Sequence, residues 1–362
     1  MAEFQAYSPS VEHITTDEPE LVREILGMMA ATQSANADRH RHATRDAHAK
    51  SHAILKARLK IHEGLPPWLA QGMFAAPREY EAVVRLSSAP GDIHSDEIPA
   101  PRGFATKILG VKGDRLVPEL GGHNQDFLMV NFPVLAFGTV AKYKQMLGLL
   151  EKNAHAPDFF QKAVAGSARL AEDVVEAFGG TPGAVLQGLA RDNNHMLGET
   201  FHTQAAIRYG DYIAKLSFAP ASDNVRALTG QPVKMTGFST MRDVVCDYFL
   251  SNGAEYQLRA QLCTGLDAMP VEDAGVQWAE GISPQQPIAT LTIWPQDART
   301  PRRRTYGDDV LSFNPWNGIE EHRPLGSIMR VRKPAYERST AFRHAENSIE
   351  RFEPERLDQI PD

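Results

Sequence analysis

The chain has 362 residues, of which 42% are apolar and 23% charged, and this composition excludes a disordered or fibrous protein. The length suits one barrel domain with extensions. A formal net charge of −7 argues against a broad phosphate-binding face, so no nucleic-acid partner is expected. We interpret the basic run Arg302, Arg303 and Arg304 as a solvated turn.

No window approaches the length of apolar sequence that a membrane span needs. The first segment, MAEFQAYSPSVEHITTDEPE, is acidic and lacks the apolar run of a secretory signal, so we expect a cytoplasmic protein. Cys246 and Cys263 do not stand in a CxxC spacing and are predicted to be buried, reduced packing residues.

The first predicted element is a helix over 18–31, where apolar residues recur at helical spacing. Thr16 or Asp17 can cap it, and Pro19 suits its first turn. A polar stretch rich in His and Arg follows. Residues 1–40 are therefore predicted to form an N-terminal helix or arm.

Apolar and basic residues then alternate with period two, which predicts a half-buried strand. Eight such short strands, separated by Gly and Pro turns without regular helices between them, favour an antiparallel barrel over a parallel sheet. A barrel of this size is filled by side chains or holds one ligand. The predicted strands cover 55–61, 80–86, 104–111, 127–132, 205–209, 212–218, 256–262 and 288–293.

Helical spacing interrupts the strands over 140–150 and 159–178, which predicts a helical insertion near 139–195 packed outside the barrel. The last helical stretch covers roughly 325–352 and contains Pro334, which is predicted to kink or restart the helix. The barrel domain is expected over 41–346 and a tail over 347–362.

Two short motifs carry chemistry. RDAHAKSH places Arg45, His48 and His52 just ahead of a strand, although a histidine in such a loop is ordinarily a surface residue. His48 and His52 at i, i+4 could hold a metal ion on a helix, but the strand-like pattern that follows argues against this.

The second motif, RVRKPAYERSTAFR, sets Arg332, Tyr336 and Arg343 at i, i+4 and i+11, which share one helix face. An Arg one turn from a Tyr favours the phenolate by charge pairing, lowering a pKa that is otherwise about 10 and making the oxygen an anionic iron ligand. Taken alone, such a pair is ordinarily only a hydrogen bond.

Together, these motifs and the segments between them resemble the haem catalases, and in particular short catalase-like haem proteins. RDAHAKSHAIL is similar to the segment that carries the distal histidine, which implies that role for His48 and a pairing of Arg45 with a haem propionate. VVRLSSAPGD and APRGFATKILG resemble the strands behind that histidine. This resemblance implies that Arg85 meets a propionate and that Ser87 hydrogen-bonds His48.

GGHNQDFLMVNFPVLAF resembles the segment that supplies the distal asparagine. Spacing leaves either His123 or Asn124 at that position, and Asn124 is preferred. The family usually has an aromatic residue further along this segment that makes a ring contact. Ungapped spacing places Ala136 at that position, where Phe137 would be needed.

LSFNPWNGIEEHRPLGSIMRVRKPAYERSTAFR resembles the proximal segment, which implies Tyr336 as the axial iron ligand, Arg332 as its partner and Arg343 near a propionate. Pro334 and Ala335 replace the aromatic residue usual before the ligand.

The similarity runs from about Arg45 to Arg343, is weak over 140–256, and lacks the C-terminal extensions of larger catalases. It implies an α+β fold, a catalase-like eight-stranded antiparallel β-barrel with surrounding helices. It also implies haem b as the cofactor and a homo-oligomer.

The implied function is a haem-dependent peroxidase or catalase-like oxidoreductase that cleaves the O–O bond of hydrogen peroxide or an organic hydroperoxide. His48, Asn124 and Ser87 would be the catalytic set, with Tyr336 holding the iron and His48 moving protons. The alternatives are a fatty-acid hydroperoxide isomerase or lyase on the same fold, a non-enzymatic haem carrier or sensor, and a metal-free ligand-binding barrel. Ala47 stands where allene-oxide-forming relatives have a Thr, which favours peroxide reduction.

Overall fold

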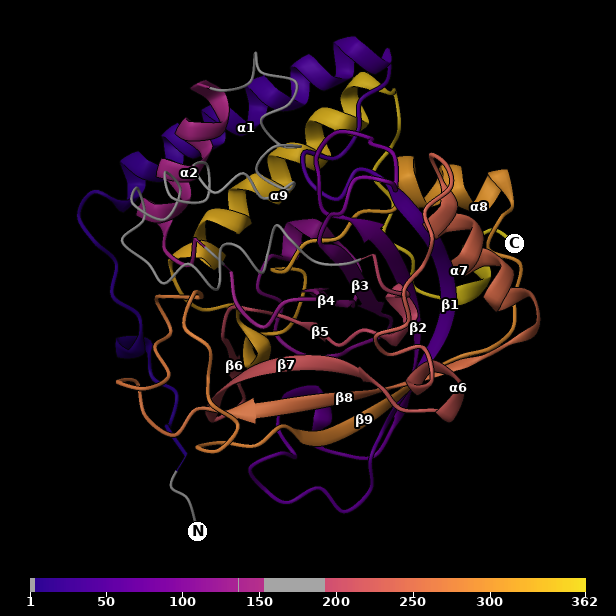
Figure 1. The fold of residues 1–362 in the computed structure, drawn as a ribbon. Coiled ribbons are helices and arrows are strands. Elements are labelled where there is room, and N and C mark those ends of the chain that lie inside the picture. The colour runs from indigo at the N-terminus through magenta and orange to yellow at the C-terminus, as the bar shows by residue number, and fades with distance from the viewer. Residues whose placement is uncertain (1–3, 136, 153–192) are drawn as a thin grey trace.

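The computed structural model describes residues 4–135, 137–152 and 193–362, and an antiparallel barrel forms its centre (Figure 1). The ring of strands closes in the order β1-β2-β3-β4-β5-β7-β8-β9, because β5 pairs with both β4 and β7 while β9 pairs with β1. Every pairing is antiparallel. The strands are β1 Ser51–Ile61, β2 Glu79–Ser88, β3 Arg102–Ile108, β4 Gln125–Val130, β5 Phe201–His202, β6 Ile207–Tyr209, β7 Tyr212–Pro220, β8 Ala254–Leu262 and β9 Gln286–Ile293.

The predicted eight-stranded barrel is confirmed, with one difference at the edge where it closes. The strand predicted over 205–209 corresponds to β6, which pairs with the start of β7. The two-residue β5 pairs with the later half of β7 and joins it to β4. Gln204 lies between β5 and β6 with a φ of 63°, so one stretch of chain breaks into two short strands. Two residues carry no detectable period, which is why the sequence did not reveal β5.

Inward-facing aromatic side chains fill the barrel. The ring of Phe104 lies 5.0 Å from that of Phe201 and 5.2 Å from those of Phe218 and Tyr256, and all four side chains are buried. Because side chains of a strand alternate between the two faces of a sheet, the residues next to Phe104 on β3 face outward. A site for a large ligand must therefore lie outside the barrel wall.

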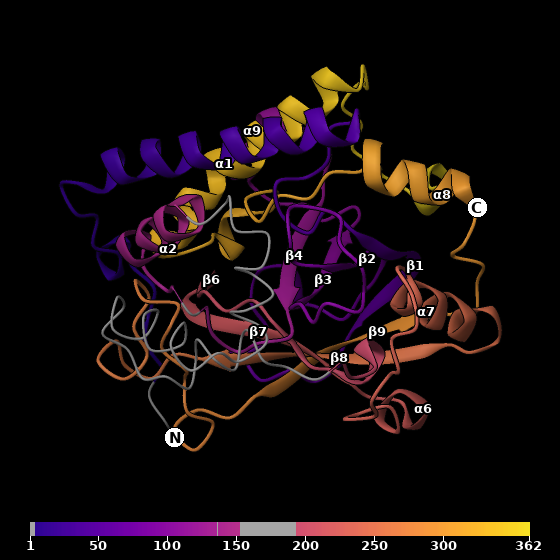
Figure 2. The ribbon, with the colours of Figure 1, turned by 45° about the horizontal axis from the view of Figure 1, so that its top comes forward.

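Helices α1, α2 and α9 pack on one another beside the barrel (Figures 1 and 2). Ile25, Val140 and Val331, one from each helix, form their buried contact. The described helices are α1 Glu18–His40, α2 Val140–Lys152, α6 Asp223–Arg226, α7 Thr240–Ser251, α8 Pro301–Thr305 and α9 Ser327–Glu346.

Three helical predictions can be compared with these elements. The helix predicted over 18–31 is confirmed as α1 and continues to His40, and that over 140–150 is confirmed as α2. The helix predicted over 159–178 lies outside the described residues. The C-terminal helix is α9, which continues through Pro334 instead of restarting there.

The basic run at 302–304 does not form a solvated turn. It forms α8, in which the side chain of Thr300 accepts a hydrogen bond from the N–H of Arg303. Arg303 is only 3% exposed, and its guanidinium donates to Gln296 at 2.9 Å and to the carbonyl of Pro361 at 2.9 Å. One arginine of the run therefore ties the C-terminal segment to the barrel.

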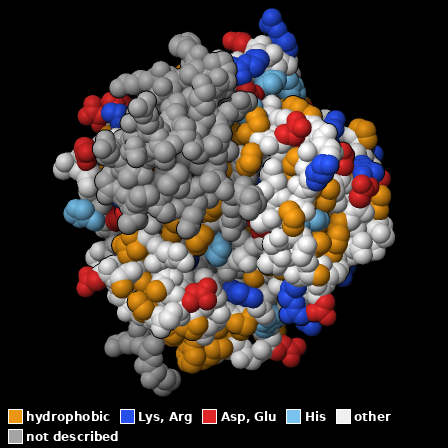
Figure 3. Space-filling model, viewed as in Figure 1, with side chains coloured by type: hydrophobic (Ala, Val, Ile, Leu, Met, Phe, Trp, Pro, Cys, Tyr) orange, Lys and Arg blue, Asp and Glu red, His pale blue; other side chains and the backbone are white. Residues whose placement is uncertain are grey.

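Other expectations concern the surface and the cysteines. Figure 3 shows acidic and basic side chains interspersed over the described part of one face. Over the ranges that the structure describes, none of the helices combines the length and apolar character of a membrane-spanning segment. Cys246 and Cys263 are free thiols and buried, as predicted.

Candidate active site

Polar side chains gather on the outer face of the barrel at one end of β1, β2 and β3. Arg85 and Ser87 alternate with the core residue Leu86, so both face outward. The strand register places Ser87 opposite Gly103 and Arg85 opposite Ala105 on β3. Two functional side chains predicted from one strand therefore share one face.

His48 lies in an irregular segment between α1 and β1. Its φ is 55°, in the left-handed region that residues with a side chain seldom adopt. Its N–H donates to the carbonyl of Ala89 at 2.8 Å, and its Nδ1 lies 3.0 Å from Ser87 Oγ. A Cβ added to Gly103 would lie 2.5 Å from that Nδ1, so the imidazole needs a glycine there.

The imidazole of His48 is neutral at pH 7. Burial, together with the positive charges of Arg85, Arg332 and Arg45, lowers the pKa of His48 to about 3. Nδ1 is occupied by Ser87, whereas Nε2 has no hydrogen-bond partner among the described residues. The nitrogen without a partner can therefore accept a proton.

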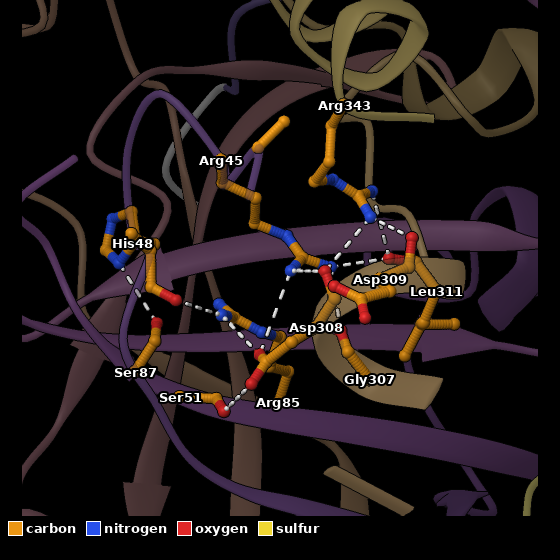
Figure 4. A network of polar contacts seen from close by, with 12 residues as sticks. Arg45, His48, Ser51, Arg85, Ser87, Gly307, Asp308, Asp309, Leu311 and Arg343 are labelled. Carbon is orange, nitrogen blue, oxygen red and sulfur yellow. Dashed lines mark hydrogen bonds and ion pairs between the residues drawn. The ribbon is translucent and has the colours of Figure 1, made fainter. Parts of the chain in front are cut away.

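Arg45, Arg85 and Arg343 converge on the segment 307–311, which follows α8 (Figure 4). Arg45 donates to the carbonyls of residues 307, 308 and 311, and Arg343 donates to those of 308, 309 and 311. Arg85 forms an ion pair with the carboxylate of Asp308 at 3.2 Å. The three predicted propionate-binding arginines thus lie together.

This arginine cluster, Arg45, Arg85 and Arg343, carries more positive charge than its neighbours neutralise. Among the described residues, Asp308 is the one carboxylate within ion-pair distance, 3.2 Å from Arg85 and 3.9 Å from Arg45. The carboxylate of Asp309 instead contacts His42. Burial first, and then the charge of Arg85, lower the pKa of Arg343 to about 10. The Nε atoms of Arg85 and Arg343 are buried and have no hydrogen-bond partner within the described ranges. Further carboxylates would suit this cluster.

Tyr336 and Arg332 face the same side of α9. The guanidinium of Arg332 donates to the phenolic oxygen of Tyr336 at 2.9 Å and lies 5.1 Å from the centre of its ring. The predicted i, i+4 contact is present because the helix continues through Pro334. The charge of Arg332 also lowers the pKa of His48, and Ser339, three residues after Tyr336, donates to Asp46, two residues before His48. The segment of His48 therefore packs against the helix that carries the Tyr–Arg pair.

The structure does not bring Asn124 to His48. Val130 of β4 pairs with Gly103, which touches the His48 ring, whereas Gln125 pairs with Ile108 at the other end of β3. These two register positions are separated by roughly 17 Å at about 3.3 Å per residue. Asn124 precedes Gln125 and therefore lies at the far end of the ladder.

The amide of Asn124 holds the C-terminal segment. It donates to Glu353 Oε2 at 3.1 Å and to the carbonyl of Pro354 at 2.9 Å. The alternative, His123, has an exposed side chain in the same loop. The C-terminal segment thus engages Asn124 in this structure, and the choice between Asn124 and His123 for the distal position stays a prediction.

His52 does not join His48 as a second metal ligand. Its Nε2 lies 2.8 Å from Ser88 Oγ, whereas His48 bonds Ser87, which faces the other side of β2. The described residues contain no group of three or more His, Cys, Asp or Glu side chains that could hold a metal ion.

Several residues at the site were missed by sequence reasoning. Asp308 neutralises part of the arginine cluster, and Asp46 and Ser339 join the segment of His48 to α9. The acidic pair DD in YGDDV and the acidic residue in RDAH were visible, but no local pattern relates them to partners hundreds of residues away. The need for Gly103 beside His48 is likewise a contact between distant segments.

Comparison with known proteins bears on the fold. No protein-family model and no curated protein sequence matches the chain. Catalase A from Saccharomyces cerevisiae matches in structure with a TM-score of 0.61 and 14% identity, covering 97% of this chain and 72% of its own. A fungal catalase matches with a TM-score of 0.58 and 15% identity, over 94% and 65%. A bacterial catalase matches with 0.57 and 13%, over 94% and 63%.

This chain therefore spans between 63% and 72% of the length of these catalases. At such low identity the likeness concerns the architecture alone. The eight-stranded antiparallel barrel and its surrounding helices have the catalase fold.

Proposed function

We propose that this protein is a haem b-dependent oxidoreductase that cleaves the O–O bond of hydrogen peroxide or an organic hydroperoxide. The observation that carries the proposal is that an arginine-bonded tyrosine, Tyr336, lies on a helix that is hydrogen-bonded to the segment of a neutral histidine, His48. Beside them lies an arginine cluster whose charge Asp308 neutralises only in part. The catalase fold supports the same assignment.

The residues present fit a haem group. Haem carries two carboxylates, and guanidinium groups bind carboxylates through paired hydrogen bonds and stay charged when partly buried. Within the described part of the chain, Arg85 and Arg343 each have a buried Nε without a partner, and the arginine cluster has one carboxylate at ion-pair distance for three cations. Tyr336 would supply an oxygen ligand to the iron. We therefore assign Arg45, Arg85 and Arg343 to the carboxylates and Tyr336 to the iron.

A bound ferric haem would supply the redox chemistry of O–O bond cleavage. His48, neutral at pH 7, would accept the proton of the hydroperoxide at Nε2 and return it to the leaving oxygen. The contact between Nδ1 and Ser87 would hold the ring in place during both transfers. Arg332 would stay bonded to the Tyr336 oxygen when that oxygen is an anionic ligand. Asn124 receives no role in these transfers because of its position.

The proposal is tested with protein expressed under an ample supply of iron and haem. Its absorption spectrum is recorded, and then oxygen evolution and peroxide loss are followed after addition of hydrogen peroxide or a fatty-acid hydroperoxide. A ferric haem spectrum with peroxide consumption supports the proposal. Rearranged or cleaved lipid products would indicate an isomerase or lyase, and haem without turnover would indicate a carrier or sensor. Protein without haem would overturn the assignment of Tyr336.

A further inference from the structure

The segment that carries His48 has no regular secondary structure between the end of α1 at His40 and the start of β1 at Ser51. Backbone hydrogen bonds hold its last residues, from the N–H of His48 to the carbonyl of Ala89 and from that of Ala49 to the carbonyl of Pro90. Side-chain contacts hold the residues before them, and several of these contacts come from α9, the helix that carries Tyr336.

One face of α9 contacts this segment and the arginine cluster. Tyr336, Ser339, Arg343 and the C-cap Asn347 follow one another at three- or four-residue spacing, which places them along a single helix face. Asn347 accepts the N–H of Ala43 at 3.0 Å and donates to its carbonyl at 2.9 Å. The helix that carries Tyr336 is therefore also hydrogen-bonded, through its C-cap, to the segment that leads to His48.

The hydroxyl of Ser339 lies at the centre of these contacts. It donates to Asp46 Oδ1 at 2.8 Å, and it accepts from Gln33 Nε2 at 3.1 Å and from the N–H of Asp46 at 3.3 Å. A hydroxyl has one donor and two acceptor sites, so its capacity is used completely. The Gln33 amide also donates to the carbonyls of Ser339 and Thr44.

These contacts are sheltered from solvent. Gln33 is 3% and Ser339 7% exposed, and burial raises the pKa of the Asp46 carboxyl. Among the described residues, Asp46 has no cation at ion-pair distance. Its carboxyl accepts from the hydroxyl of Ser339 and from the backbone N–H groups of Asp46 and Ala47. A serine hydroxyl can donate to the neutral and to the ionised form of a carboxyl group.

We propose that Gln33, Asp46 and Ser339 form a clasp that sets the position of His48 relative to Tyr336. This inference rests on the proposed function, since the separation of the two residues matters when a group binds between them. Asp46 and Ser339 are positioning residues and touch neither substrate nor iron. Ser339 lies three residues after Tyr336 on α9, and Asp46 lies two residues before His48, so the clasp links the two sides of the site by a short path.

The first test is a double-mutant cycle on the unfolding of the haem-free full-length chain. Ser339→Ala and Asp46→Ala should each destabilise the protein, and the double variant should lose less than the sum of the two, because both remove the same hydrogen bond. Thr340→Val is the matched control, since Thr340 is the next hydroxyl on α9 and makes no side-chain hydrogen bond within the described ranges. Additive losses would overturn the clasp.

The second test measures cyanide binding to the haem-loaded protein, because association of HCN requires a distal base and no turnover. Ser339→Ala should keep the haem spectrum and haem affinity, while the cyanide association rate constant falls about 10- to 100-fold through misplacement of His48. Ser339→Thr, which restores a hydroxyl, should recover most of the rate. An unchanged cyanide rate in Ser339→Ala would overturn the positioning role. Failure of the proposed function would look different, because the unmodified protein itself would then bind no haem.

Discussion

The guanidinium of Arg332 donates a 2.9 Å hydrogen bond to the phenolic oxygen of Tyr336, one turn further along α9. The bond places a permanent positive charge against the oxygen that we assign to the iron. The same positive charge lowers the pKa of His48 and so helps to keep its imidazole neutral.

Replacing Arg332 with Leu should weaken haem binding by about 10- to 100-fold, the effect of losing a hydrogen bond to a charged group worth about 1.5–3 kcal/mol. Haem titration followed by absorbance measures the change. Arg338→Leu is the control, since Arg338 lies on the same helix and donates instead to the carbonyl of Leu26. Equal haem affinities for the Arg332 variant and the unmodified protein would contradict the assigned role.

Replacing His48 with Ala should leave haem bound and lower the rate of peroxide consumption by about 10²–10⁴-fold, the usual contribution of a positioned base. Ser87→Ala should have a smaller effect, because it removes the contact that orients the ring and keeps the base itself. Stopped-flow measurement of the peroxide reaction gives both values. Full activity in His48→Ala would remove this residue from the mechanism.

The variant Asn124→Ala distinguishes a structural role of this amide from a catalytic one. Its hydrogen bonds to Glu353 and Pro354 predict a loss of about 1–3 kcal/mol in the free energy of unfolding. The carbonyl of Pro354 loses its donor, whereas Glu353 Oε2 keeps the ammonium of Lys107 at 2.8 Å. The rate of the peroxide reaction should change little. A slowed reaction at unchanged stability would instead support the distal role that the family resemblance implies.

His322 should make stability depend on acid pH. It is buried, its Nε2 accepts the N–H of Met73 at 3.1 Å, and burial lowers its pKa from the usual 6.5 to about 3. Between these values the unfolded chain binds more protons, so the contribution is fully present above pH 6.5 and is lost as pH falls toward 3.

His322→Gln, which keeps an acceptor for Met73, should therefore reduce the fall in the denaturation midpoint between pH 7 and pH 4. His13→Gln serves as the control because His13 is exposed. An identical pH dependence in His322→Gln and the unmodified protein would contradict this prediction.

Sequence periodicity was sufficient to predict the barrel, because seven of its eight strands are long enough to show a pattern. The eighth predicted strand corresponds to β6, which pairs with β7 beside the short strand β5. The two-residue β5 has no such signal. Local spacing also predicted the contact between Arg332 and Tyr336, since residues four apart on a helix are neighbours.

Contacts between distant segments were harder to anticipate. The resemblance named Arg45, Arg85 and Arg343, and the structure brings them together, but nothing in the sequence indicated that Asp308 lies among them. Asn124 illustrates the opposite case. A short motif suggested its role, whereas the register of β4 and the docking of the C-terminal segment determine where its side chain lies.

Haem titration of the unmodified protein and of Tyr336→Phe shows whether Tyr336 holds a haem iron. Tyr306→Phe is the control, because the buried hydroxyl of Tyr306, unlike that of Tyr336, has no hydrogen-bond partner among the described residues. We expect one haem per chain with a ferric absorption band in the unmodified protein and in Tyr306→Phe, and a lost or greatly weakened band in Tyr336→Phe. The same spectrum and affinity in all three proteins would contradict this expectation.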